Sequence, residues 1–452
     1  MKLDRVRPYL NNTLWMLAEK SARILVGIFL FAYIARYLGP AEFGVLSYAV
    51  VLAAFCEPLI ALGLNRILVR DLVKFPQQEG QLLGTVFVCR LVIALLCMVG
   101  LGALAYFSVF GSDQARPLVI ALALGNLFLA LSVIELFFQA RLKAKFASLY
   151  KTGAFLLASL LKLALVLGEA PLLFFAIANS LELVFAGVLG LLTFRRNFGD
   201  SAPWRFHSAT ARRLLLESWP EVLAGICTLL CLRLDQFMLE HLVGVEELGI
   251  FAVAARLTDA WYFVPVALVS ATFPGVVAQR EVSHEGYLRS LQNLLLLLTA
   301  VSYAIVLPTV LLSHLLIDWL FGEAYQQAAS MLAIYILCLP LIAWGSCSGS
   351  WIFAEGRIKL TAYRTILGAS VNFVLNVTLI PLWGGHGAAL ATVLSLFVAF
   401  YLFDLCIKDM RVLFVMKSRA LVLWGLVSYL MEYLPRQERS DAQEQAGKDD
   451  AK

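Results

Sequence analysis

Long apolar stretches alternate with short polar clusters along almost the whole chain. Most of these stretches reach about 20 residues, the length that a helix needs to cross a bilayer. The pattern predicts twelve membrane-spanning helices, over residues 14–36, 43–65, 83–107, 117–138, 148–168, 171–193, 214–240, 248–273, 290–312, 328–350, 361–382 and 386–406. A shorter apolar stretch at 412–434 predicts an interfacial helix, and a poorly formed thirteenth span is the alternative.

Composition supports an all-α polytopic membrane protein. The 452 residues are 61% hydrophobic and 15% charged, whereas average soluble domains are about 45–50% apolar and about 25% charged. Twelve spans leave no room for a large soluble domain. The eight cysteines lie in apolar runs, and the sequence contains neither a phosphate-binding loop nor a metal-ligand spacing, so no cofactor is expected. No signal peptide is predicted, because the first apolar run is long and charged.

The distribution of Lys and Arg predicts the topology. Of the 36 cations, 28 fall at the termini and in alternate connections, whereas the opposite connections hold only Arg36 and Arg116. Because cationic loops stay on the cytoplasmic side, both termini are predicted to be cytoplasmic. The remaining six cations lie inside the predicted spans.

An internal repeat relates the two halves of the chain. At an offset of 205 residues, RYLGPAEFGVLSYAV (36–50) aligns with HLVGVEELGIFAVAA (241–255), matching Gly39 with Gly244 and Gly44 with Gly249. The repeat predicts two six-helix lobes related by an axis along the membrane normal. The expected organisation is a first lobe at 1–194, a cytoplasmic linker at 195–213, a second lobe at 214–410, an interfacial or partial helix at 411–434 and a disordered cytoplasmic tail at 435–452.

Three segments carry a family resemblance: RYLGPAEFG, LGLNRILVRDLVK and RLDQFMLEHLVGVEELGIFAVAARLTDAWYFVP. With these segments, the chain resembles the Wzx-type O-antigen and polysaccharide flippases of the multidrug/oligosaccharidyl-lipid/polysaccharide exporter superfamily. The resemblance implies two lobes around a central cavity lined largely by the first, second, seventh and eighth spans. It also implies translocation of undecaprenyl-diphosphate-linked oligosaccharide from the cytoplasmic to the periplasmic leaflet of a bacterial inner membrane.

Charged residues inside the spans are the candidate site, because charge at the bilayer centre costs at least about 2.5–3.5 kcal/mol. Arginine presents a fixed fork to phosphate oxygens, so the diphosphate or head group is expected to bind Arg23, Arg90, Arg233 and Arg256. Local pairing is an equally weighted alternative for Arg23 with Glu19 and for Arg256 with Asp259. For Arg90 and Lys162 the alternative is snorkelling to the membrane surface.

Acidic side chains within the spans are candidates for coupling transport to protons or other cations. These cavity carboxylates are Glu57, Asp235 and Asp259, with structural ion pairing as the alternative. Glu19, Lys20 and Trp261 are further cavity candidates. Trp261 could stack on a sugar ring, although aromatic residues also populate interfacial belts.

The leading hypothesis is a lipid-linked oligosaccharide flippase that works by alternating access and is not an enzyme. The glycan lipid and the bilayer are its expected partners, with a polysaccharide polymerase and a chain-length regulator as further candidates; no nucleic acid is expected. The alternative is a drug/cation antiporter of the multidrug branch. A membrane polysaccharide polymerase or ligase is less favoured, because the predicted non-cytoplasmic connections are short.

Overall fold

A computed structural model describes residues 3–107, 113–198, 203–280 and 283–423, with the side chains of the first helix described from Arg23 onward except that of Leu25. Within these ranges every regular element is a helix. Nine helical segments of the described chain are long and apolar enough to cross a membrane, or ten if a bent pair in the ninth α-helix is one span. The predicted all-α, multi-pass membrane protein is therefore confirmed.

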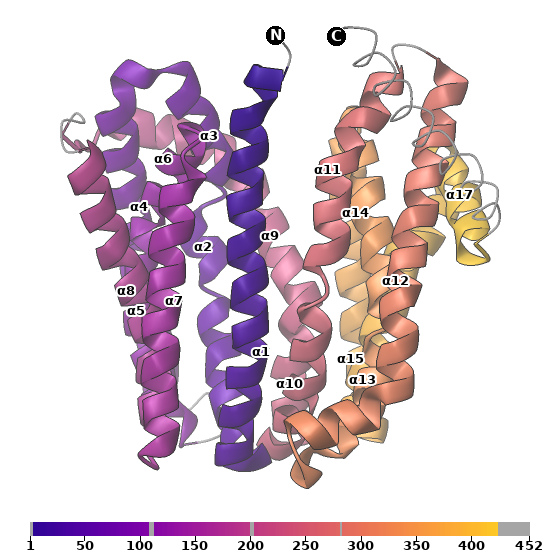
Figure 1. The fold of residues 1–452 in the computed structure, drawn as a ribbon. Coiled ribbons are helices and arrows are strands. Elements are labelled where there is room, and N and C mark those ends of the chain that lie inside the picture. Colours follow the sequence, from indigo (N-terminus) through magenta and orange to yellow (C-terminus); the bar gives the residue numbers. More distant parts are fainter. Residues whose placement is uncertain (1–2, 108–112, 199–202, 281–282, 424–452) are drawn as a thin grey trace, which may run out of the picture. The chain divides into compact units, whose positions relative to one another are not determined.

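The chain forms two compact units, of which the first comprises Met1–Leu257, His314–Met331 and Asn372–Ala391. The helices of its first stretch are drawn in indigo to pink in Figure 1. Up to the end of the first long stretch they are α1 (Leu3–Ala54), α2 (Glu57–Ala61), α3 (Asn65–Lys74), η1 (Pro76–Gln78), α4 (Glu79–Tyr106), α5 (Ala115–Asn126), η2 (Leu127–Ser132), α6 (Val133–Ala140), α7 (Ala144–Leu167), α8 (Leu172–Phe198), α9 (Ser208–Leu242) and α10 (Val245–Asp259).

The second unit comprises Thr258–Ser313, Leu332–Val371 and Thr392–Lys452. The remaining helices, some of which pass from one unit into the other, are α11 (Phe263–Arg280), α12 (His284–Leu320), η3 (Glu323–Tyr325), α13 (Gln327–Tyr335), α14 (Cys338–Ala354), α15 (Ile358–Phe397), the π-helical turn η4 (Val398–Leu402), α16 (Phe403–Cys406), η5 (Lys408–Met410) and α17 (Arg411–Leu421).

Small residues allow close helix packing in the first unit. Helices α1, α7 and α8 lie side by side, and α5 packs against α8. At the α5–α8 crossing, a Cβ added to Gly125 would lie 2.7 Å from the Ser180 Cβ. Contacts of this kind are typical of membrane helices, because lipid provides no hydrophobic force to drive helices together and close packing has to do so. Outward positions are apolar, as at Leu96 and Leu160, each 62% exposed.

The glycines of the sequence repeat occupy equivalent places in the first unit. Gly39 and Gly244 both adopt positive φ, 72° and 127°, a region that glycine enters without steric cost. A Cβ on Gly44 would lie 1.8 Å from the Val245 carbonyl oxygen, and one on Gly249 would lie 2.0 Å from that of Pro40. Because Val245 is Pro40 shifted by 205 residues, each repeat makes the same backbone contact with the other.

Two of the candidate spans are too long to be single crossings. Val26–Lys74 and Lys359–Cys406 contain 49 and 48 residues, and a continuous helix of that length would extend about 70 Å, more than twice the hydrocarbon thickness of about 30 Å. Each contains a non-helical glycine, Gly39 or Gly384. Each also covers two of the predicted segments.

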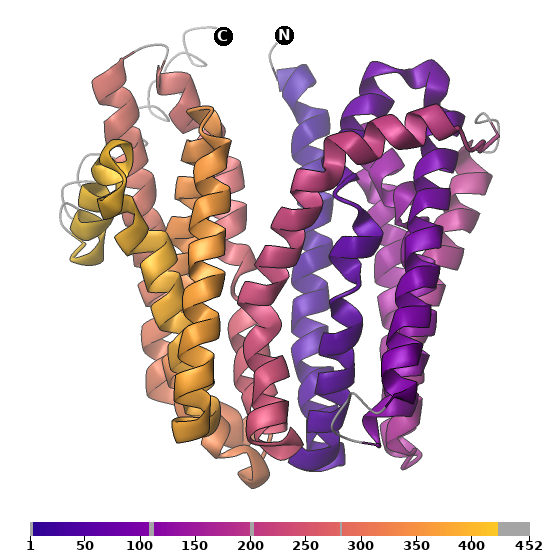
Figure 2. The same ribbon diagram turned by 180° about the vertical axis from the view of Figure 1, so that it is seen from behind.

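The connection predicted as a linker is partly ordered against the first unit. Arg205 donates its backbone N–H to the Gly80 carbonyl oxygen at 3.1 Å, next to the start of α4. After it, α9 begins and bends by 48° between Ser208–Leu230 and Leu232–Leu242. Figure 2 shows the first part of α9 crossing obliquely before the helix descends.

The predicted interfacial or partial helix at 411–434 contains α17, and the rest of that segment beyond Leu423 lies outside the described residues, as does the tail at 435–452. α17 docks through a buried polar cluster. Lys417 donates to the Asp404 carboxylate at 2.6 Å and to the Phe400 carbonyl oxygen at 2.7 Å. Both charged side chains are fully buried, and burial lowers the pKa of the Lys417 amine.

Phe400 lies in the π-helical turn, whose altered hydrogen bonding exposes a backbone carbonyl to a side-chain donor. Arg364 of α15 stacks on the Phe400 ring with 4.7 Å from its guanidinium carbon to the ring centroid. The same guanidinium donates to Ser348 Oγ at 2.7 Å. One helix turn of the last span is thus held by side chains from α15 and α17.

Candidate functional site

A three-member charge cluster joins α1, α7 and α8 in the first unit. Arg23 of α1 donates to Glu182 Oε1 of α8 at 2.9 Å, and Lys162 of α7 contacts Glu182 Oε2 at 3.1 Å. Arg23 also lies over the Phe155 ring, 5.2 Å from its centroid. The described members of the cluster are thus two cations and one carboxylate.

The side-chain exposures of this Arg23 cluster (Arg23, Lys162 and Glu182) are graded: 33% for Arg23, 21% for Glu182 and 11% for Lys162. Arg23 thus pairs with a residue 159 positions away, and the side chain of its proposed local partner, Glu19, lies outside the described residues. Lys162 does not snorkel, since a carboxylate on the neighbouring helix neutralises it within the protein.

Arg90 occupies a different and almost completely buried site, with 1% exposure. Its guanidinium donates to Ser132 Oγ and to Asn65 Oδ1, both at 2.6 Å, and to the Ala61 carbonyl oxygen at 3.3 Å. These partners come from η2, α3 and the end of α2. In the described structure Arg90 therefore ties three short elements together, and a ligand would have to displace those bonds to reach it.

Two predicted site residues lie on α9 and a third lies opposite them on α2. Arg233 is half-buried and attracts the exposed Glu57 electrostatically. Asp235 is 1% exposed, and its Oδ1 accepts the backbone N–H of Gln236 at 2.8 Å. Arg233 and Asp235 thus lie on the part of α9 that follows its bend, and Glu57 of α2 interacts electrostatically with Arg233.

The remaining candidates lie at the end of α10 or before the described side chains. Arg256 is exposed and lies over the Phe31 ring of α1, 5.7 Å from its centroid. Asp259 is half-buried at the last position of α10, and Trp261 is 40% exposed. The side chain of Lys20, like that of Glu19, lies outside the described residues. Neither Arg233 nor Arg256 joins the Arg23 cluster through a described contact.

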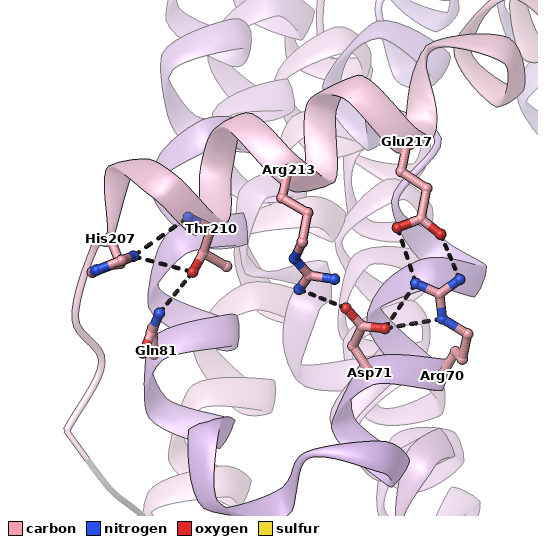
Figure 3. Close-up of polar contacts among 7 residues, drawn as sticks. All are labelled: Arg70, Asp71, Gln81, His207, Thr210, Arg213 and Glu217. Carbon is pink, nitrogen blue, oxygen red and sulfur yellow. Dashed lines mark hydrogen bonds and ion pairs between the residues drawn. The ribbon is translucent and has the colours of Figure 1, made fainter.

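Sequence reasoning missed a set of ion pairs that joins α3 to the first half of α9. Arg70 donates two hydrogen bonds to the Glu217 carboxylate, at 2.5 and 3.0 Å, and Arg213 donates one to the Asp71 carboxylate at 2.8 Å (Figure 3). Arg70 also contacts Asp71 at 2.8 Å. This α3–α9 clasp (Arg70, Asp71, Arg213 and Glu217) has an almost fully buried centre, since Asp71 is 1% exposed.

Two further contacts extend the same contact surface. Arg66 approaches Glu221 at 3.4 Å, one helical turn from the clasp on both helices. At the start of α9, Gln81 of α4 donates to Thr210 Oγ1 at 2.6 Å, and His207 caps the helix by accepting the Thr210 N–H (Figure 3). The sequence does contain a signal for this contact: Arg66 and Arg70 are four residues apart, as are Glu217 and Glu221. The count of Lys and Arg in the connections did not take this spacing into account.

Comparison with known proteins gives these features a context. The chain matches the family model described as "Polysaccharide biosynthesis protein" over residues 9–279 and the MatE model over residues 220–378. A "Probable flippase AglR" of Haloferax volcanii is 24% identical over 388 residues, covering 82% of this chain and 77% of that protein. A "Putative O-antigen transporter" of Shigella flexneri is 21% identical over 399 residues, covering 84% and 93%.

Solved structures share the fold. The lipid II flippase MurJ in an inward closed conformation has a TM-score of 0.69 at 14% identity, covering 94% of this chain and 93% of that one. An inward-facing multidrug resistance MATE family transporter has a TM-score of 0.66 at 16% identity, covering 91% and 98%. The predicted membership of the exporter superfamily is confirmed, and the chain belongs to the polysaccharide biosynthesis protein family.

Proposed function

We propose that this protein is a flippase that moves an undecaprenyl-diphosphate-linked oligosaccharide from the cytoplasmic to the periplasmic leaflet of a bacterial inner membrane. The substrate would be an O-antigen, capsule or exopolysaccharide repeat unit. The names of the two relatives support a transport function for lipid-linked glycan, and the family match supports a place in polysaccharide synthesis. In this proposal the two lobes alternate access to the two leaflets, and no covalent bond is broken.

The Arg23 cluster is the observation that carries the proposal. All three of its helices contribute to candidate spans, although Arg23 lies three residues before the first of them. Charged groups are costly in a membrane. Arg23 is the most exposed member of the cluster, and a diphosphate is an anion that arginine binds through charge-assisted bonds. Arg233 and Arg256, which also lie in the first unit, are proposed as further head-group ligands, with Arg90 as a buried support.

The proposed topology has twelve spans and cytoplasmic termini. Two long candidate spans each cover two predicted segments, which supports more crossings than the nine or ten segments selected by length and hydropathy. On this topology the α3–α9 clasp lies on the cytoplasmic side. The lobes remain as proposed from the repeat, with the linker at 195–213 between them.

Glu57, Asp235 and Asp259 are proposed to couple transport to protons or other cations, with Glu19, Lys20 and Trp261 as further cavity positions. Asp235 has the strongest support, because it is a carboxylate buried to 1% exposure. A polysaccharide polymerase and a chain-length regulator are the proposed protein partners, since translocated repeat units have to be polymerised.

Complementation of a strain that lacks the gene tests the proposed function. Wild-type protein should restore surface glycan and the periplasmic exposure of the lipid-linked repeat unit, whereas Arg23→Ala should reduce both by at least tenfold. Arg66→Ala is a matched control, because Arg66 is 81% exposed and paired on the surface of the protein. Unchanged sidedness of the lipid-linked unit in the deletion strain, with no second flippase present, would refute the proposal.

A drug/cation antiporter is the second candidate, supported by the MatE match over 220–378 and the fold of MATE transporters. In that case Arg23→Ala would leave glycan export intact and alter drug resistance. A polymerase or ligase would instead change glycan chain length without changing the sidedness of the repeat unit.

A further inference from the structure

The two oxygens of the Glu182 carboxylate bind different cations. Oε1 contacts Arg23 at 2.9 Å and Oε2 contacts Lys162 at 3.1 Å, so neither cation depends on the other for its bond. Lys162 is the most buried member of the cluster and Arg23 the most exposed. Arg23 can therefore leave Glu182 without taking Lys162 with it, and it is the member with access to a ligand.

The cost of breaking a buried ion pair comes mainly from the partner that is left charged and unpaired. If Arg23 and Glu182 formed a simple pair, an anionic ligand that bound Arg23 would leave the Glu182 carboxylate charged and unpaired. In this cluster Lys162 still neutralises Glu182, so the penalty is largely removed. Lys162 is thus needed to neutralise Glu182 only when Arg23 binds a ligand instead of Glu182.

We propose that Glu182 and Lys162 are positioning residues for the head group: Glu182 holds Arg23 when no substrate is bound, and Lys162 neutralises Glu182 when a diphosphate ester takes Arg23. This inference rests on the proposed function. It makes Glu182 a competitor of the substrate for Arg23, which favours release of the diphosphate at the end of a transport cycle. The Phe155 ring beneath Arg23 supports the guanidinium in either arrangement.

The proposal predicts effects of opposite sign for two neighbouring residues. Glu182→Gln removes the competing charge and should tighten binding of farnesyl diphosphate to the purified full-length protein by at least threefold. Lys162→Met leaves Glu182 unpaired once Arg23 is engaged and should weaken binding at least tenfold. In the Glu182→Gln background, Lys162→Met should have no further effect. Titration calorimetry in detergent measures all four dissociation constants.

A second Lys–Glu pair provides the matched control. Lys151 contacts Glu135 at 2.9 Å between α6 and α7; Arg90 attracts that carboxylate electrostatically, but no described hydrogen bond joins the two. Lys151→Met and Glu135→Gln should change the dissociation constant by less than twofold. If Lys162→Met does not yield folded protein, Lys162→Gln, which keeps a donor for Glu182 but no charge, should still weaken binding at least threefold.

Two results would overturn the inference. One is a change of affinity in the same direction for Glu182→Gln and Lys162→Met, and the other is an equal loss from Lys162→Met with or without Glu182. If the wild-type protein binds farnesyl diphosphate and Arg23→Ala abolishes binding, such results refute the roles of Glu182 and Lys162 and leave the proposed function standing. If the wild-type protein binds no diphosphate and Arg23→Ala exports glycan normally, both proposals fail.

Discussion

The buried charges around α17 allow an ordering of mutant stabilities to be predicted from charge balance alone. Lys417 and Asp404 are both fully buried and 2.6 Å apart, and Arg364, 4% exposed, attracts Asp404 electrostatically. The group holds two cations and one anion. Asp404→Asn would leave two buried cations without a counter-charge, whereas Lys417→Met would leave Asp404 balanced by Arg364.

Breaking a buried pair by removing one partner costs about 3–5 kcal/mol when the other charge is orphaned, and this range is expected for Asp404→Asn. Lys417→Met loses the ion pair and the bond to the Phe400 carbonyl oxygen but orphans no charge, so about 1–3 kcal/mol is expected. For a cooperative unit of about 150–250 residues, each kcal/mol lowers the unfolding midpoint by about 2–4 °C. Asp404→Asn should therefore lower it by roughly 10 °C.

Thermal unfolding followed by intrinsic fluorescence in detergent measures these shifts. The double variant Lys417→Met/Asp404→Asn retains only the Arg364 charge and should be more stable than Asp404→Asn alone. A milder effect of Asp404→Asn than of Lys417→Met, or losses that simply add in the double variant, would show that charge balance does not control the stability of this cluster.

Three further predictions concern the first unit. Gly44→Ala and Gly249→Ala each place a methyl group within 2 Å of a backbone oxygen; each should lower the unfolding midpoint by more than 5 °C, and a tolerated alanine would mean that the contact is loose. Arg70→Glu should lower the midpoint by several degrees and Arg70→Glu/Glu217→Arg should restore most of it, whereas a double variant no better than the single one would exclude direct pairing. Arg90→Met removes three hydrogen bonds made by an almost fully buried guanidinium and should cost about 2–4 kcal/mol, which wild-type-like chemical denaturation would contradict.

Helix positions and the repeat could be predicted from sequence because both depend on local patterns. Each of the twelve predicted segments falls on helical structure, and the aligned glycines Gly39 and Gly244 share a positive φ. The number of spans was harder to establish, since Gly39 and Gly384 turn the chain without a polar loop and leave two apolar segments joined. The π-helical turn was not predicted, and the described donor to its Phe400 carbonyl oxygen, Lys417, comes from α17.

The ion-pair partners could not be predicted, because they depend on which helices pack together. For Arg23 the spacing rule for helices suggests Glu19, four residues away; the Glu19 side chain lies outside the described residues, and the described partner, Glu182, comes from another helix. The cations of the α3–α9 clasp were assigned to polar connections, whereas the structure places Arg70 on α3 and Arg213 on α9. Counting cations also gave no information on Asp71 and Glu217, which bind them. The charged residues within the spans can be identified from the local sequence, whereas their partners depend on the tertiary packing of the helices.

The contact between Gly44 and Gly249 has the geometry of an isologous dimer interface, in which the same patch of two copies meets across an axis. Gly44 faces Gly249, its equivalent in the other repeat. Methyl groups added to both residues would therefore compete for the same space. Where only a backbone oxygen enters the contact, the side chains of the two copies can change independently, as those of Pro40 and Val245 have done. At the axis, each copy limits the size of the other.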